Sequence, residues 1–390
     1  MIKTGLIAIV FSISTILTLT NEANKAFGFT FTKIADTNEI YSSFKFPAIN
    51  QVGNVVFTAD LASGGNGIFA GNGLGLITIA DNTGFNSFGQ FAGINDNGAV
   101  AFKANANTGE TGVFIYRDGL VRQVAQGTNY FSISDPVINN NDNVAFNATI
   151  NGVSGIFTNI SSGTSLSPIA DTSSVYSNFD RPSINQFGTV AFSASLKNGG
   201  GRGIYTVNRN GTTNTVVDTS GDFDFLFNPA INNTGVVAFK AVLDALAGEG
   251  IYTASNGVIN KIVDNTDRFD FFDNPTINDK GNVAFKGVLK GGGLGIYTGA
   301  NPDSDKVIAV GDSLFGGIVT DLYISNQSLN NNNQLAFYAK FDNGTTGIFR
   351  ADPDIQSSSP STSIPEASSV LGILALSALG MGVRRRQNWY

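Results

Sequence analysis

The sequence predicts an all-β protein, a seven-bladed β-propeller in which an N-terminal strand closes the last blade. Three observations support this architecture. One pattern recurs seven times, at spacings of 44 to 52 residues that suit a four-stranded blade. The strand that the last copy lacks occurs before the first copy. The 390 residues include 46 Gly and 31 Phe and are only 14% charged, as is typical of short strands joined by tight turns.

The chain contains neither Cys nor His, which excludes several kinds of active site. Without Cys there is no disulfide and no thiolate-bound zinc ion. Without His there is no Ser-His-Asp or Cys-His nucleophile system. The formal net charge of −7 also argues against nucleic acid as a partner, because phosphate binding requires a basic face.

Residues 1–28 are expected to be a secretory signal peptide. Lys3 is followed by an apolar run from Leu6 to Leu19 and then by polar and small residues. Ala26-Phe27-Gly28 supplies small residues at both positions that cleavage requires. An uncleaved membrane anchor is the alternative interpretation. With cleavage after Gly28, the body of the protein begins at residue 29.

Each copy of the repeat begins with an Asn-x-x-Gly turn. In a type I turn, Asn at the first position caps the turn backbone, and the positive φ at the fourth position suits Gly. Asp142 and Asn333 replace the Gly in two copies, and these residue types tolerate left-handed geometry best. We therefore interpret the turn Asn as structural. The seven turn residues are Asn50, Asn95, Asn139, Asn185, Asn232, Asn278 and Asn330.

Three further strands are expected in each copy. Val-Ala-Phe, as at Val190–Phe192, places large residues on one face and a small residue on the other, where a neighbouring sheet can approach closely. Gly-Ile-Phe or Gly-Ile-Tyr, as at Gly203–Tyr205, forms the third strand, and Ile259–Asp264 exemplifies the fourth. The seventh copy lacks the fourth strand, which Phe31–Asp36 can supply. Residues 29–353 would then form a closed ring; an open β array is the alternative.

The C-terminal segment has the features of a sorting signal. Residues 354–364 form a Ser/Pro-rich linker. Residues 365–390 contain Pro365-Glu366-Ala367, a short apolar helix over 368–383, and Arg384-Arg385-Arg386. This helix barely spans a bilayer, and the Arg cluster would hold its C-terminal end in the cytoplasm. A permanent single-pass anchor is the alternative.

This order of Pro-Glu motif, short helix and Arg cluster resembles the PEP-CTERM sorting signal, although Ala367 stands where Pro is usual. In that family the signal is recognised by an exosortase, in Gram-negative bacteria that make exopolysaccharide. All seven repeats also resemble the NxxGxxAF tandem repeats of bacterial surface proteins. The two resemblances imply export, transient anchoring in the inner membrane, processing by an exosortase-type partner, and display on the outer surface or in the extracellular matrix. They imply no catalytic residue and no ligand.

An Asp ends the fourth strand in most copies. A ring of carboxylates at one mouth of the propeller could bind calcium, which favours several oxygen ligands. The alternative, favoured by the repetition, is that each Asp caps the turn into the next blade. No other metal or cofactor is expected. The candidates are Asp36, Asp81, Asp171, Asp218 and Asp264.

The segments between blades hold two further kinds of candidate. Asp222 with Asp224, or Asp270 with Asp273, could form the carboxylate pair of a glycosidase. The Asp-box motifs of propeller sialidases are absent, which argues against this activity. Aromatic residues could stack on a sugar, although packing between blades is the favoured role. These residues are Tyr41, Phe88, Tyr130, Tyr176, Phe225, Phe271 and Tyr323.

These features together favour an exported, non-catalytic surface or matrix protein that binds extracellular polysaccharide. An extracellular glycan-active enzyme, a carboxylate-based hydrolase or lyase on the propeller scaffold, is one alternative. A protein-interaction scaffold is another.

Overall fold

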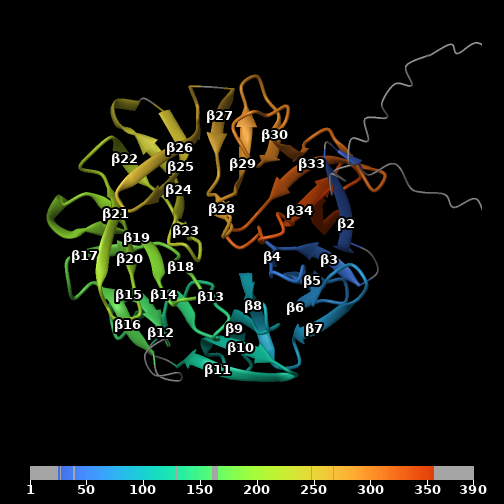
Figure 1. The fold of residues 1–390 in the computed structure, drawn as a ribbon. Helices are drawn as coiled ribbons and strands as arrows, with labels where there is room; N and C mark the ends of the chain where they lie inside the picture. Colours follow the sequence, from blue (N-terminus) through green and yellow to red (C-terminus); the bar gives the residue numbers. More distant parts are fainter. Residues whose placement is uncertain are drawn as a thin grey trace, which may run out of the picture. The chain divides into compact units, whose positions relative to one another are not determined.

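The computed structural model describes residues 25–26, 28–37, 40–127, 130–159, 166–246, 248–266 and 268–354. The rest of the expected signal peptide, the linker beyond Asp354 and the expected sorting signal lie outside the described residues. No helix in the described part is both long and apolar enough to cross a membrane. The described residues form seven antiparallel sheets arranged around a central axis (Figure 1). The prediction of a seven-bladed β-propeller is therefore confirmed.

In each of the first six blades, the strands pair in chain order from the inner edge of the sheet to its outer edge. The first blade contains β3 (Tyr41–Phe44), β4 (Ala48–Ile49), β5 (Val55–Leu61), β6 (Asn66–Gly71) and β7 (Leu76–Ala80). The second contains β8 (Phe85–Ile94), β9 (Val100–Ala106), β10 (Thr111–Arg117) and β11 (Leu120–Gln126). The third contains β12 (Tyr130–Phe131), β13 (Val137–Ile138), β14 (Val144–Ile150), β15 (Val153–Thr158) and β16 (Ser167–Asp171).

The next three blades repeat this plan, with two short 3-10 turns, η2 (Lys197–Gly199) and η3 (Asp244–Leu246). The fourth blade contains β17 (Tyr176–Phe179), β18 (Ser183–Ile184), β19 (Val190–Leu196), β20 (Arg202–Val207) and β21 (Thr213–Asp218). The fifth contains β22 (Phe223–Leu226), β23 (Ala230–Ile231), β24 (Val237–Leu243), β25 (Gly248–Ser255) and β26 (Val258–Asp264). The sixth contains β27 (Phe269–Phe272), β28 (Thr276–Ile277), β29 (Val283–Leu289), β30 (Leu294–Tyr297) and β31 (Lys306–Ala309).

The seventh blade is built from both ends of the repeat region. Its C-terminal strands are β32 (Ser313–Leu314), β33 (Gly317–Tyr323), β34 (Leu335–Phe341) and β35 (Thr346–Pro353), and its N-terminal strands are β1 (Lys25–Ala26) and β2 (Phe29–Asp36). Strand β2 pairs antiparallel with β35, from Phe29 opposite Pro353 to Asp36 opposite Gly347. The predicted closure of the ring by an N-terminal strand is therefore confirmed.

Proline determines where the inner strand of a blade is interrupted. In five blades a Pro stands between the two halves of this strand: Pro47, Pro136, Pro182, Pro229 and Pro275. Proline lacks the N–H that a ladder hydrogen bond needs, so it breaks the pairing at that point. The second blade has Ala92 at the same place, and its inner strand β8 is continuous.

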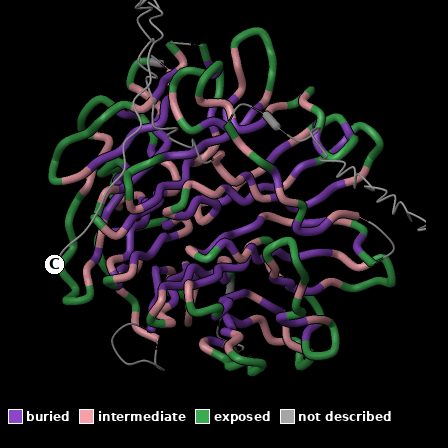
Figure 2. The backbone as a smooth tube through the Cα atoms, turned by 45° about the vertical axis from the view of Figure 1, so that its right-hand side comes forward, coloured by how far each residue is buried: buried purple, intermediate pink, exposed green. Residues whose placement is uncertain are grey.

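Seven hydrophobic clusters, one for each interface between neighbouring blades, form the core. Ala191 of the fourth blade, for example, packs with Val237 and Phe239 of the fifth. Both faces of the Val-Ala-Phe strand are therefore buried, and the small residue allows the next sheet to approach closely. Buried segments follow the strands, and exposed segments lie mainly in the loops between them (Figure 2).

Replacement of Phe31 by Ala should destabilise the whole ring. Phe31 is buried in β2 and meets the ring of Phe337 edge-on, with centroids 5.9 Å apart. We expect Phe31→Ala to lower the free energy of unfolding by about 3–5 kcal/mol. The measurement is guanidinium denaturation followed by circular dichroism.

The neighbouring substitution Thr30→Ala is the matched control. The Thr30 hydroxyl donates only an exposed hydrogen bond, 2.7 Å long, to Asp354. This change should shift the free energy of unfolding by no more than about 0.5 kcal/mol. If both substitutions had equally small effects, β2 would not be docked on the seventh blade.

Candidate functional site

The seven turn Asn residues form a closed ring of hydrogen bonds at one end of the central channel. Each Asn side chain donates from Nδ2 to the backbone carbonyl of the turn Asn in the next blade, and all seven residues are at most 5% exposed. The bond from the seventh blade back to the first closes the ring. The bonds, 2.9 to 3.2 Å long, run Asn50 to Asn95, Asn95 to Asn139, Asn139 to Asn185, Asn185 to Asn232, Asn232 to Asn278, Asn278 to Asn330, and Asn330 to Asn50.

The same side chain also caps its own turn. In the third blade, Asn139 Oδ1 accepts hydrogen bonds from the backbone N–H groups of Asn141 and Asn143. The fourth turn residue has positive φ in every copy, including Asp142 at 56° and Asn333 at 59°. Sequence reasoning identified the cap but missed the bond to the next blade. The sequence did contain a sign of this bond. Asp or Ser would cap the turn as well, so the presence of Asn in all seven copies indicates that the amide N–H is also needed as a donor.

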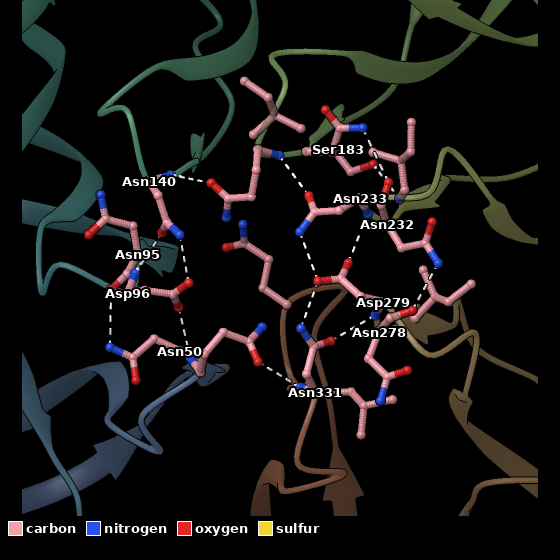
Figure 3. Close-up of a pocket in the computed structure, with 18 of the residues that line it drawn as sticks. Asn50, Asn95, Asp96, Asn140, Ser183, Asn232, Asn233, Asn278, Asp279 and Asn331 are labelled. Atoms are coloured by element: carbon pink, nitrogen blue, oxygen red, sulfur yellow. Dashed lines mark hydrogen bonds between the residues drawn. The ribbon is translucent and has the colours of Figure 1, made fainter.

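A second ring is formed by the residue after each turn Asn, and all seven of its members line the channel. The backbone N–H of each member donates to a side-chain oxygen of the corresponding residue in the next blade, over 2.7 to 2.9 Å. Figure 3 shows members of this ring facing one another around the channel. Every member is therefore an amide or an acid: Gln51, Asp96, Asn140, Gln186, Asn233, Asp279 and Asn331.

The two rings leave a small polar cavity of about 110 Å³ at the turn end of the channel. A cavity of this size holds a few water molecules rather than an organic ligand. The two acids of the second ring already accept further hydrogen bonds, as Asp96 does from Asn140 Nδ2 at 2.6 Å and Asp279 from Asn331 Nδ2 at 2.6 Å. The turn end is therefore built to join the blades.

The middle of the channel differs from blade to blade. Four residues before the turn Asn, the seven blades carry Phe46, Phe91, Asp135, Arg181, Asn228, Asn274 and Asn326. Phe46 stacks on Phe91 with centroids 4.5 Å apart, and the Arg181 guanidinium lies 3.8 Å from the Phe91 centroid. Burial raises the pKa of Asp135, and this effect exceeds the lowering of the pKa by the positive charges of Arg181 and Lys103.

At the mouth opposite the turns, aromatic rings are stacked on buried cations. Lys286 Nζ lies 3.9 Å from the Tyr323 centroid, and Lys240 Nζ lies 4.0 Å from Phe271 and 4.7 Å from Phe227. The Arg202 guanidinium lies 4.5 Å from the Phe225 centroid. All three cations are buried.

Each of these cations also has a carboxylate partner. Arg202 pairs with Asp180, Lys240 with Glu249 at 2.9 Å, and Lys286 with Asp273 at 2.7 Å. A buried charge requires such pairing. The rings of Phe225 and Phe271 are nevertheless 41% and 45% exposed. This mouth therefore presents exposed aromatic faces that fixed, paired charges support from below.

The aromatic residues singled out in the sequence divide between these environments. Tyr41 and Tyr176 are buried within their blades, and Phe88 is half-buried. Phe225, Phe271 and Tyr323 lie at the charged mouth, and the Tyr130 side chain lies outside the described part. The prediction that these residues lie between blades was wrong, because all of them belong to the inner strand of a blade. Sequence reasoning missed Phe46, Phe91 and Phe227, which lie in or beside the same strands.

The Asp residues that end the fourth strands lie at the periphery, because these strands are the outermost in their blades, except β2, which only the two-residue strand β1 covers. In four of them, one carboxylate oxygen accepts hydrogen bonds from both the backbone N–H and the hydroxyl of the residue two positions later. These are Asp81, Asp171, Asp218 and Asp264. Asp36 instead pairs with Lys33 at 2.7 Å. Among the described residues, no three acidic side chains are grouped so as to hold a metal ion.

The two carboxylate pairs considered for glycoside hydrolysis occupy different surroundings. Asp222 and Asp224 are exposed and lie near Asp244. The pKa of Asp244 is raised by desolvation and by the negative charges of Asp224 and Asp222. In the other pair, Asp270 is exposed whereas Asp273 is held by Lys286. Neither arrangement pairs a proton donor with a free carboxylate across a cleft.

The substitution Asn139→Asp tests the ring of turn Asn side chains. The new carboxylate would keep the turn cap but would place an oxygen, in place of Nδ2, against the Asn185 carbonyl. We expect the free energy of unfolding at pH 7 to fall by about 3 kcal/mol. Burial would raise the folded-state pKa of the new carboxyl above its unfolded value of about 3.9. The loss relative to wild type should therefore be smallest below that value and should grow as the pH rises through the folded-state pKa.

Asn208→Asp provides the matched control. Asn208 Oδ1 caps an equivalent turn by accepting from Asn210 and Thr212, but its Nδ2 donates no hydrogen bond to any described residue. Chemical denaturation of both variants from pH 3 to pH 8 should show the loss for Asn139→Asp only. Equal stability of the two variants at pH 7 would show that the ring of turn Asn side chains contributes nothing to stability.

Comparison with solved structures shows the same fold at low sequence identity. An oligogalacturonate lyase in complex with manganese matches with a TM-score of 0.55 and 11% identity, over 85% of this chain and 98% of the lyase. A puromycin-hydrolyzing peptidase from Mycobacterium tuberculosis matches with a TM-score of 0.54 and 11% identity, over 86% of this chain and 55% of the peptidase. Prolyl endopeptidases match with a TM-score of 0.51 and 12% identity, over 81% and 51% of the respective chains.

The chain thus spans about half the length of these peptidases, and the likeness concerns the propeller alone. A search of curated proteins gave no match. A sequence family described as "Family of unknown function (DUF7453)" matches residues 29–224, just over half of the 390 residues. The chain belongs to this family.

Proposed function

We propose that this protein is an exported, non-catalytic component of the cell surface or extracellular matrix, and that its propeller binds polysaccharide. The observation that carries the proposal is the pair of exposed rings, Phe225 and Phe271, at the charged mouth. Aromatic faces bind the C–H faces of sugar rings, and the adjacent charged and polar groups bind hydroxyls. Arg202 and Lys240 hold these two rings from beneath.

The charges at this mouth support binding rather than catalysis. A general acid or base needs a proton that it can exchange at the working pH. Lys240 and Lys286 are buried in ion pairs with Glu249 and Asp273. Asp222 and Asp224, the best placed carboxylates for catalysis, are exposed beside a third carboxylate. We therefore place the glycan-active enzyme second to the binding protein.

Export and sorting rest on the sequence at the two ends of the chain. The signal peptide over residues 1–28 would direct the chain across the inner membrane, and the apolar segment over 368–383 would hold it there. An exosortase-type protease would then cleave near Pro365-Glu366 and leave the propeller outside the cell. The acidic net charge suits a soluble exported body.

Removal of both exposed rings should weaken binding to polysaccharide. We expect native-gel retardation by at least one of three polymers, dextran, xanthan or alginate. In the double variant Phe225→Ala/Phe271→Ala the apparent affinity should fall about tenfold, equivalent to about 1.4 kcal/mol. The control is Phe187→Ala, because Phe187 is 69% exposed at the turn end of the propeller.

Two results would contradict this proposal. One is the absence of retardation by all three polymers together with polymer cleavage that Asp224→Asn abolishes, which would favour the enzyme. The other is stoichiometric recovery of an envelope protein on the immobilised propeller without any polymer binding, which would favour the interaction scaffold.

Mass spectrometry of the protein released by a bacterium that encodes an exosortase tests sorting. We expect the secreted form to begin near residue 29 and to lack everything beyond the Pro365-Glu366 region. A variant with Glu366→Ala should accumulate in the membrane fraction with its tail intact. Recovery of a secreted form that still carries Arg384–Arg386 would show that the tail is not a sorting signal.

A further inference from the structure

One lysine at the charged mouth differs from the two that occupy the same strand position. The residue after Val-Ala-Phe is Lys in three blades: Lys103, Lys240 and Lys286. Lys240 and Lys286 each have a carboxylate partner and an aromatic ring. Lys103 is half-buried and has neither an ion pair nor a hydrogen bond with any described residue. Its charge is therefore available to a ligand.

A cavity of about 260 Å³ opens beside Lys103, between the second and third blades. This volume lies just below the range of about 300–1,000 Å³ that holds drug-sized ligands, so a single small ring is a suitable occupant. The lining is mostly polar and includes one aromatic ring: Ser87, Phe88, Gln90, Asn105, Thr111 and Asp135.

Two acceptors in the cavity wall have no hydrogen-bond partner. Asn105 Oδ1 and Asp135 Oδ1 are both buried and unbonded. Buried polar atoms in folded proteins are nearly always bonded, so an unbonded pair that lines a cavity points to a missing donor. The Asp135 carboxylate is fixed in place, because its other oxygen accepts from the Gln90 backbone N–H at 3.2 Å. Gly89 permits this approach, since a Cβ there would lie 1.7 Å from Asp135 Oδ1.

The local charge favours an anion. Asp135 interacts with both Arg181 and Lys103, so the three groups together carry one net positive charge. Arg181 lies over Phe91 and has Asp135 as its charged neighbour. Lys103 therefore supplies the excess positive charge, within a chain whose formal net charge is −7.

We propose that this cavity is a binding subsite for a hexuronic acid residue of an acidic polysaccharide. The sugar carboxylate would pair with Lys103 Nζ, and neighbouring sugar hydroxyls would donate to the free oxygens of Asn105 and Asp135. The Phe88 ring, half-buried in the wall, would meet the apolar face of the sugar. This inference rests on the proposed binding of polysaccharide and names the sugar class that this end of the mouth selects.

The test compares two monosaccharides on the full propeller. Titration of glucuronate and glucose, followed by NMR or calorimetry, should give binding of glucuronate at least tenfold tighter than that of glucose. Lys103→Met should weaken glucuronate binding at least tenfold and leave the weak glucose binding unchanged. Lys280→Met, which removes the same charge from an exposed turn, should leave both affinities unchanged. Circular dichroism of each variant checks that the fold is intact.

The outcomes separate this inference from the proposed function. If glucose and glucuronate bound equally and Lys103→Met had no effect, the uronate subsite would be disproved although dextran binding at Phe225 and Phe271 could stand. Retention of alginate by the Lys103→Met variant at wild-type affinity would also overturn the subsite. If no polymer bound at all, both the proposed function and the subsite would fail.

Discussion

The structure depends on hydrogen bonds that every blade donates to the next. Within each turn, the Asn side chain donates to a carbonyl of the following blade, and the next backbone N–H donates to a side-chain oxygen there. In an open array the last blade would lose both acceptors, and the carbonyl of Asn50 would lose its donor. A buried polar group left without a partner costs about 1–3 kcal/mol. Closure of the ring is therefore favoured by hydrogen bonding as well as by packing.

The rest of the fold brings neighbouring turns close enough for these hydrogen bonds between blades to form. The small residue of Val-Ala-Phe brings each sheet close to the next, so that neighbouring turns lie within hydrogen-bond distance. Strand β2 joins the N-terminal end to the seventh blade, which holds that blade in the ring. A Gly at the start of the third strand has a related role, since a Cβ at Gly250 would lie 2.6 Å from the Val263 carbonyl oxygen. The same residue types, such as the small residue of Val-Ala-Phe and the Gly of the third strand, therefore serve both the local backbone geometry and the closure of the ring.

The sequence predicts the periodic part of the structure well and the rest poorly. Blade number, turn geometry and the closing strand follow from local patterns that recur seven times, so each copy checks the others. The ring of Asn side chains was not predicted, because the partner of Nδ2 lies 44 to 52 residues away in six blades and 280 residues away in the seventh. The pairing of Lys240 with Glu249 and the stacking of Arg181 on Phe91 likewise depend on side chains that only the folded ring brings together. These non-periodic contacts make up the mouth, which is why the candidate site was the less predictable part.

The two ends of the channel thus differ in how uniform their residues are. The turn end carries an amide or acid in every blade, whereas the charged and aromatic side chains of the opposite mouth vary among the blades. Geometry explains the uniform end, and the non-uniform mouth is where recognition of a ligand is expected. Both interpretations require the ring to be closed and to unfold as one unit.

Native-state hydrogen exchange, read by mass spectrometry, tests ring closure most directly. In a closed ring the turns of all seven blades are hydrogen-bonded to one another, so the backbone amides of all the blades should exchange with a single, global free energy of opening. Strands β2 and β35 should show the same protection as the middle blades. If the first and seventh blades exchanged well before the others, with protection falling from the centre of the chain to its ends, the blades would form an open array and the account would be contradicted.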